Sequence, residues 1–161
     1  MIRYELSNEQ DKLELNVLFE EAKPYFNEVE GRDPLPPLID INKIIPEIPK
    51  DKCHSLSIFY KDKLVGWMWI FDESDDCYYI LHMYIGLEYR QKGIAKKVIE
   101  LLDEDYRNRG FSRSELLVSG SNYQGLKFWT GVGYDKITFI EAPEEGAVTS
   151  SVELGLSKKL R

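Results

Sequence analysis

The fold of this protein is decided by the stretch Met83-Tyr84-Ile85-Gly86-Leu87-Glu88-Tyr89-Arg90-Gln91-Lys92-Gly93-Ile94-Ala95. It predicts a buried strand, a tight basic turn and the first turn of a long helix. The first N–H groups of a helix lack intrahelical partners, and the helix dipole adds positive charge at the same end. Gly93 lets a ligand approach the backbone, and Arg90, Lys92 and Lys96 add charge around it. The stretch therefore predicts a phosphate site, with an ordinary surface turn as the alternative.

The loop in this stretch matches neither G-x-x-x-x-G-K-[ST] nor G-x-G-x-x-G. The first pattern is typical of nucleoside triphosphate sites and the second of dinucleotide sites. A different phosphate-bearing ligand is therefore expected.

Upstream of this stretch, three apolar runs over residues 55–60, 64–71 and 77–85 predict a meander of strands. The last two runs are apolar on both faces, which is typical of central strands covered on each side. Helices are therefore expected on both faces of the sheet.

Downstream, a helix of about four turns is expected to end at Gly110. Its apolar positions are Ile94, Val98, Leu102 and Tyr106. A strand is expected over 115–118, and the capping box Ser121-Asn122-Tyr123-Gln124 opens a short helix through Trp129. Strands over 134–140 and 148–156 close the chain.

The first fifty residues predict one strand, one amphipathic helix and a proline-rich segment. The strand covers 2–6, and the capping box Ser7-Asn8-Glu9-Gln10 starts the helix. The expected buried stripe of that helix is Leu13, Val17, Leu18 and Ala22. The segment 31–49 holds five prolines and room for one short helix with Leu38, Ile41, Ile44 and Ile45. The element order is β-α-α-β-β-β-α-β-α-β-β.

Composition indicates one globular domain over residues 1–161. The chain has 161 residues, 43% of them hydrophobic, and a net charge of −7 that argues against nucleic acid or anionic membranes as partners. The start of the chain lacks the layout of a signal peptide, no apolar run is long enough to span a membrane, and Cys53 and Cys77 form no metal or disulfide pattern. A cytoplasmic location and no metal are therefore expected.

Two motifs resemble the GNAT superfamily of N-acetyltransferases. Arg90-Gln91-Lys92-Gly93-Ile94-Ala95 matches the family pattern R/Q-x-x-G-x-G/A, which binds the pyrophosphate of acetyl-CoA. A second pattern, N-x-x-A-x-x-F-Y-x-x-x-G-F, is met by Asn122, Gly125, Phe128, Gly133 and Tyr134, with Gly125 where alanine is usual. The resemblance implies an α/β (α+β) fold with a mixed, mostly antiparallel sheet of about seven strands.

The resemblance also implies roles for individual residues. The strand around Met83, Tyr84 and Ile85 should splay from its neighbour, pair with the pantetheine arm and aim one amide at the thioester oxygen. Asn122 and Phe128 should contact the cofactor arm. Acetyl-CoA would be the cosubstrate.

The implied reaction is direct attack of a primary amine on the thioester in a ternary complex. Many family members use a tyrosine after the phenylalanine of the second motif as proton donor, and here that position is Trp129. Tyr84, Tyr123 and Tyr134 are the substitutes by residue type. His82 shares a strand face with Tyr84 and is the candidate base, with a structural histidine as the alternative.

The sequence leaves the acceptor and the assembly open. A small-molecule or peptide amine is expected, and a cationic one because acidic residues lie in the region that borders the acceptor in the family: Glu20, Glu21, Glu28, Glu30 and Asp33. A homodimer is possible by this reading. The competing function is an acyl-CoA sensor or scaffold that transfers nothing, suggested by Trp129.

Overall fold

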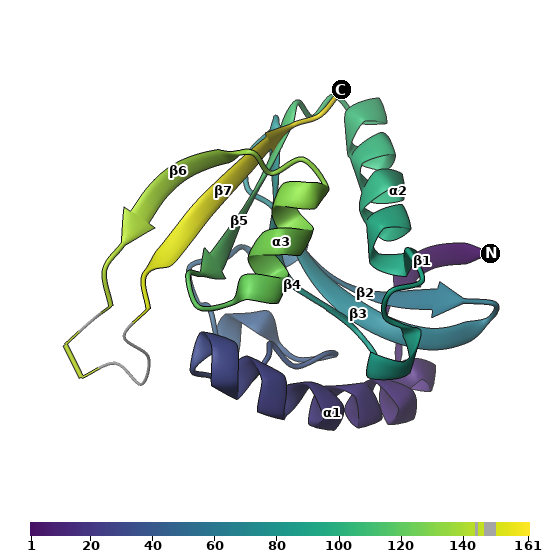
Figure 1. Cartoon of the computed structure of the whole chain (residues 1–161). Helices are drawn as coiled ribbons and strands as arrows, with labels where there is room; N and C mark the ends of the chain where they lie inside the picture. The colour runs from purple at the N-terminus through teal and green to yellow at the C-terminus, as the bar shows by residue number, and fades with distance from the viewer. Residues whose placement is uncertain (144, 147–150) are drawn as a thin grey trace.

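The described residues form one seven-stranded sheet and three α-helices (Figure 1). The computed structural model describes residues 1–143, 145–146 and 151–161. The strands are β1 Ile2–Leu6, β2 Cys53–Tyr60, β3 Lys63–Asp72, β4 Cys77–Ile85, β5 Arg113–Ser119, β6 Lys136–Glu141 and β7 Glu153–Lys159. The helices are α1 Lys12–Glu30, α2 Ile94–Asn108 and α3 Tyr123–Gly131.

The strands lie in the order β1-β2-β3-β4-β5-β7-β6, and among the described strands only the β4–β5 pair is parallel. The mixed, mostly antiparallel sheet is thus confirmed. β4 pairs with β5 only as far as Ile80 opposite Leu116. At the same point β4 carries one extra residue against β3, since Ile70 faces Ile80 and Trp69 faces His82. Such a bulge bends its strand, which accounts for the parting of β4 from β5.

Helices cover both faces of the sheet, as expected. α1 lies on one face, and α2 and α3 lie on the other (Figure 1). Successive side chains of β3 point to opposite faces of the sheet, so β3 contributes to a separate core cluster on each face. Trp67 and Trp69 pack in the cluster that includes α1, whereas Met68 and Ile70 pack in the cluster that includes α2.

The buried stripe expected for α1 is partly wrong. Leu18 and Ala22 are buried, but Leu13 and Val17 are 82% and 69% exposed, and Leu15 is buried instead. Leu15, Leu18 and Ala22 also fit helical spacing, so the sequence alone supports two rotations of the helix. Packing against the tryptophans of β3 selects the observed one. The capping box also lies one residue later than expected, on Asn8 and Asp11.

The proline-rich segment contains no α-helix among its described residues. The short helix expected there is reduced to one 3-10 turn, Ile41–Lys43, and a second 3-10 turn, Lys50–Lys52, follows the segment. Prolines lack the N–H that a longer helix would need. The segment is nevertheless anchored on the α1 side of the sheet, because Trp67 Nε1 donates to Leu35 O at 3.1 Å and Trp69 Nε1 donates to Pro36 O at 2.9 Å.

The last two strands form the far edge of the sheet. β6 begins two residues later than predicted, and of the strand predicted over 148–156 the residues 148–150 lie outside the described part. All six residues of β6 are exposed, so its outer edge is free for pairing among the described residues, and a homodimer stays a prediction. In the described part of the chain, no helix is long and apolar enough to cross a bilayer.

Candidate active site

A cavity of about 1820 Å³ lies where β4 and β5 part. Its walls include residues 79–85 of β4 and 116–118 of β5. The resemblance implied this divergence, and the structure shows it. The residues of β4 beyond Ile80 therefore have no partner strand on the β5 side within the described part of the chain.

The loop from β4 to α2 presents its backbone to this cavity. Gln91 and Gly93 adopt positive φ angles of 57° and 74°, and Gly93 is the N-cap of α2. Having no side chain, Gly93 leaves the first N–H groups of α2, those of Ile94, Ala95 and Lys96, without a side-chain cap. A Cβ built on Gly93 would meet no atom within 4 Å. These open donors and the helix dipole form a cradle for an anion.

The basic residues around the cradle divide into two groups. Lys96 lines the cavity, and so does Lys127 of α3, which sequence reasoning missed. Arg90 also lines it, but its Nε donates to Ile85 O at 3.0 Å. Lys92 is absent from the described residues of the wall, and its Nζ lies 5.5 Å from the centre of the Tyr89 ring.

Arg90 is directed toward aromatic rings. Its guanidinium carbon lies 4.9 Å from the ring centre of Tyr84 and 5.4 Å from that of Tyr25. A cation over an aromatic face is favourable. The first residue of the loop motif therefore stabilises the end of β4, while the backbone of the motif lines the cradle.

Asn122 is the N-cap of α3, one position after the start of the expected capping box. Its Oδ1 accepts the N–H of Gly125 at 2.9 Å and the hydroxyl of Tyr25 at 2.6 Å. Its Nδ2 donates to Glu30 Oε1 at 2.9 Å, which leaves one N–H of the amide for a ligand. Phe128 also lines the cavity and packs edge-on against Trp129 at 4.8 Å.

The three candidate tyrosines lie in different places. Tyr84 lines the cavity, and its hydroxyl donates to Glu21 Oε2 at 2.9 Å. Burial and this bond raise the pKa of Tyr84 above its ordinary value. Tyr123 is 79% exposed, and Tyr134 is fully buried with its hydroxyl 2.7 Å from Ser114 Oγ. Neither is among the described residues of the cavity wall.

His82 lines the cavity but is only 6% exposed. Its ring lies 4.5 Å from that of Trp67 and 5.2 Å from that of Phe26. Burial among these rings lowers the pKa of His82 to about 3. Such a weak base is neutral at physiological pH and poorly suited to accept a proton from an ammonium group.

We expect His82→Gln to reduce the sensitivity of the fold to acid. The pKa of His82 is lower in the folded chain than in the unfolded one, near 6.5, so unfolding takes up a proton below that pH. The contribution of His82 to the free energy of unfolding is therefore full above pH about 6.5 and decreases as the pH falls toward 3. Urea denaturation at pH 7, 5 and 4 measures the free energy of unfolding of both proteins. If that free energy falls equally steeply with pH in the two proteins, His82 does not have a lowered pKa in the folded chain.

The acidic residues suggested as attracting the acceptor are only partly in place. Glu30 and Asp33 line the cavity, whereas Glu20, Glu21 and Glu28 are not among its described wall residues. Arg32 and Arg90 balance the two acids. The neighbouring wall, formed by α1, the proline-rich segment and β4, is called here the acceptor half. It is apolar and aromatic, with Phe19, Tyr25, Phe26, Pro34, Leu35, Pro36, Ile44, Ile45, Tyr79 and Tyr84.

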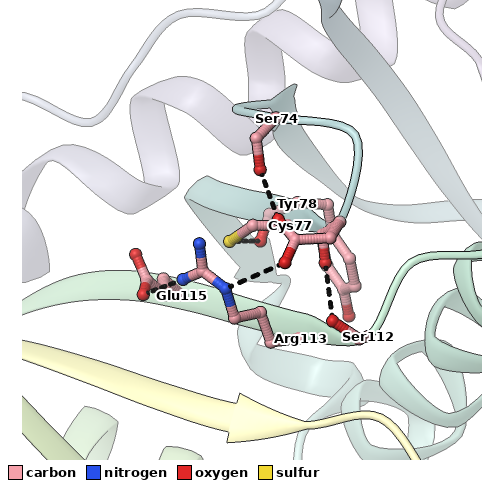
Figure 2. A network of polar contacts seen from close by, with 7 residues as sticks. Ser74, Cys77, Tyr78, Ser112, Arg113 and Glu115 are labelled. Carbon is pink, nitrogen blue, oxygen red and sulfur yellow. Dashed lines mark hydrogen bonds and ion pairs between the residues drawn. The ribbon is translucent and has the colours of Figure 1, made fainter.

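A second polar cluster lies away from the cavity, at the start of β4 and β5 (Figure 2). Ligand-type atoms of Glu73, Cys77 and Glu115 lie within 4.8 Å of one another. Glu115 is paired with Arg113, and burial raises the pKa of Cys77 to about 12. A protonated thiol beside a bound guanidinium is a poor metal ligand set. This cluster supports no metal site.

The chain belongs to the acetyltransferase (GNAT) family, which matches residues 15–134. It is similar to an uncharacterized N-acetyltransferase of Bacillus subtilis, YycN, with 32% identity over 93 residues. The match covers 56% of this chain and 59% of that relative, so it spans less than two thirds of the relative's length.

Solved structures of the family share the fold. A Bacillus subtilis acetyltransferase in complex with CoA superposes with a TM-score of 0.69 at 16% identity, covering 100% of both chains. An acetyltransferase of Salmonella typhimurium that modifies the N-terminal serine of ribosomal protein L7/L12 superposes with a TM-score of 0.79 at 11% identity. The match covers 99% of this chain and 95% of that one. A GNAT family acetyltransferase of Elizabethkingia anophelis with acetyl-CoA bound superposes with a TM-score of 0.67 at 12% identity. The match covers 99% of this chain and 98% of that one.

Proposed function

We propose that this protein is an N-acetyltransferase that moves the acetyl group of acetyl-CoA to a primary amine by direct attack. The observation that carries the proposal is the open helix N-terminus at Gly93, which faces a cavity between two parting strands. A diphosphate needs several N–H donors at one point, and this loop offers them without competing side chains. Membership of the family supports the same ligand.

The residues present fit acetyl-CoA. Backbone N–H groups of Ile94, Ala95 and Lys96 would hold the diphosphate, with Gln91 and the Lys96 side chain beside them. The edge of β4 at Met83 and Ile85 would pair with amides of the pantetheine arm. Acetyl-CoA supplies an activated acyl group as a thioester. The protein supplies alignment, and fixing two reactants in place accounts for a large part of such rate accelerations.

The acceptor half of the cavity favours an amine with an apolar or aromatic body. Aromatic, aliphatic and proline side chains line it, and the neutral ring of His82 lies against Phe26. Glu30 and Asp33 are the two carboxylates that would attract a cationic amine, small or peptidic. Two free cysteines, one of them buried, support a cytoplasmic location.

Release of free thiol from acetyl-CoA tests the proposal. A panel of arylalkylamines, aliphatic diamines and peptides with free N-termini is added in turn, and thiol is followed with a chromogenic reagent. At least one amine is expected to raise thiol release well above the amine-free rate, with the acetylated amine identified by mass. The control is the same mixture without protein.

The alternative function is an acyl-CoA sensor or scaffold, which Trp129 suggests because an indole N–H is no proton source at neutral pH. Tight acetyl-CoA binding with thiol release at the background rate for every amine would favour this alternative. A competition between acetyl-, propionyl- and succinyl-CoA separates a different acyl preference from both.

A further inference from the structure

The cavity lacks a hydroxyl at position 129, but it receives one from a different helix. Tyr25 of α1 lines the cavity and its hydroxyl donates to Asn122 Oδ1 at 2.6 Å. That contact places the hydroxyl at the N-terminus of α3, two turns before Trp129 in the same helix. Tyr123, the first residue of α3, is exposed, and Tyr134, which follows the other end of the helix, is buried; neither is among the described wall residues.

Tyr25 also bridges the gap between the two parting strands. On one side its ring lies under the guanidinium of Arg90, which is bonded to the carbonyl of Ile85 at the end of β4. On the other side its hydroxyl reaches Asn122, three residues after the end of β5. Both Tyr25 and Asn122 line the cavity, so their contact lies at its wall between the end of β4 and the segment that follows β5.

Gly125 makes this arrangement possible. A Cβ at position 125 would lie 2.6 Å from Asn122 Nδ2 and 2.9 Å from Asn122 Oδ1. Both distances are shorter than any real Cβ contact, so an alanine there would displace the Asn122 side chain that holds Tyr25. The two departures from the family pattern, Gly125 and Trp129, are thus connected through one hydroxyl.

We propose that Tyr25 is the proton donor to the departing thiolate in this chain, in place of a tyrosine on α3. This inference rests on the proposed acetyl transfer. The amine nitrogen forms a bond to the carbonyl carbon, the C–S bond breaks, and its electron pair stays on sulfur. The Tyr25 hydroxyl gives its proton to that sulfur. The proton lost by nitrogen passes to solvent, and solvent returns one proton to the Tyr25 phenolate.

The surroundings of Tyr25 suit this role. Burial raises the pKa of Tyr25, while the charge of Arg90 and the bond to Asn122 oppose that rise. The hydroxyl therefore carries its proton at neutral pH, and the guanidinium stabilises the phenolate left after transfer. Tyr84 lies under the same guanidinium, but its hydroxyl donates to the Glu21 carboxylate, and burial together with this bond raises the pKa of Tyr84. The Tyr25 hydroxyl donates to a neutral amide oxygen, and it gives up that bond when it donates to sulfur.

Tyr25→Phe tests the inference, with Tyr60→Phe as the matched control because Tyr60, at the end of β2, lies outside the described cavity wall. The thiol of bound CoA is titrated by its thiolate absorbance in the ultraviolet. A donor to sulfur favours the thiolate, so Tyr25→Phe is expected to raise the pKa of the bound thiol. Affinity for CoA should stay within about twofold, and the transfer rate should fall about 100-fold or more. Tyr60→Phe should match the parent protein in all three measurements.

The outcomes separate this inference from the proposed function. If Tyr25→Phe weakens CoA binding but leaves the thiol titration unchanged, Tyr25 only positions Asn122 and the inference is overturned. If the parent protein transfers acetyl to no amine, the proposed function fails, and the thiol titration still reports whether Tyr25 donates to sulfur. A transfer rate unchanged by Tyr25→Phe would also overturn the inference.

Discussion

Gly93→Val is expected to weaken acetyl-CoA binding by about 100-fold or more, which corresponds to about 2.8 kcal/mol. Gly93 has a φ of 74° and an empty space above its Cα that opens onto the cavity. A branched side chain would fill this space and block the N–H groups of Ile94 and Ala95. Because the new atoms would meet no protein atom near Cβ, the fold should persist with modest strain.

Calorimetry measures the affinity, and thermal unfolding measures the strain. The matched control is Gly110→Val, because Gly110 also has a positive φ, of 93°, and also has nothing within 4 Å of a built Cβ. It lies outside the described cavity wall, beyond the C-terminus of α2. Gly110→Val should carry similar strain and leave the affinity unchanged. Equal affinities for Gly93→Val and the parent protein would refute the cradle.

Gly66→Ala is expected to destabilise the fold by about 1–3 kcal/mol or more. A Cβ at this position in β3 would lie 2.2 Å from the carbonyl oxygen of Tyr84 and 2.9 Å from Ile85 Cδ1. The first contact is with the backbone of the neighbouring central strand, which cannot move without disturbing the sheet. Each kcal/mol should lower Tm by about 2–4 °C in a chain of this size.

Urea denaturation compares this variant with Gly131→Ala. Gly131 is the last residue of α3, and a Cβ there would meet nothing within 4 Å. Its φ is not positive, so alanine should be neutral or stabilising by about 0.4–1 kcal/mol. Equal midpoints for Gly66→Ala and Gly131→Ala would show that β3 and β4 can separate locally, contrary to the packing described above.

Local patterns were sufficient for the central elements of the fold. β4 has the bounds predicted for it, and α2 begins at the predicted Ile94. Both predictions depend on residues close together in the sequence. An apolar run between turn residues is typical of a buried strand, and a glycine before an apolar-periodic segment is typical of the start of a helix. The cradle at Gly93 follows from the same few residues, which is why the sequence alone could locate it.

The sequence did not predict which distant residues individual side chains contact. Arg90 was expected near the phosphates, yet it binds the end of β4 and lies over Tyr84 and Tyr25. Tyr25 was not singled out at all, because it is 97 residues from Asn122 in sequence. Helical periodicity places a residue on a face of its own helix and carries no information about a distant helix cap.

The sequence by itself determined most strand and helix positions along the chain, the turn before Ile94 that we expect to bind an anion, and the family, because each depends on short stretches of neighbouring residues. Only the tertiary structure decided which side of α1 is buried, how far β4 and β5 run together and which hydroxyl reaches the N-terminus of α3. These features depend on close packing between segments far apart in the chain, where several local solutions are nearly equal in energy until the core selects one.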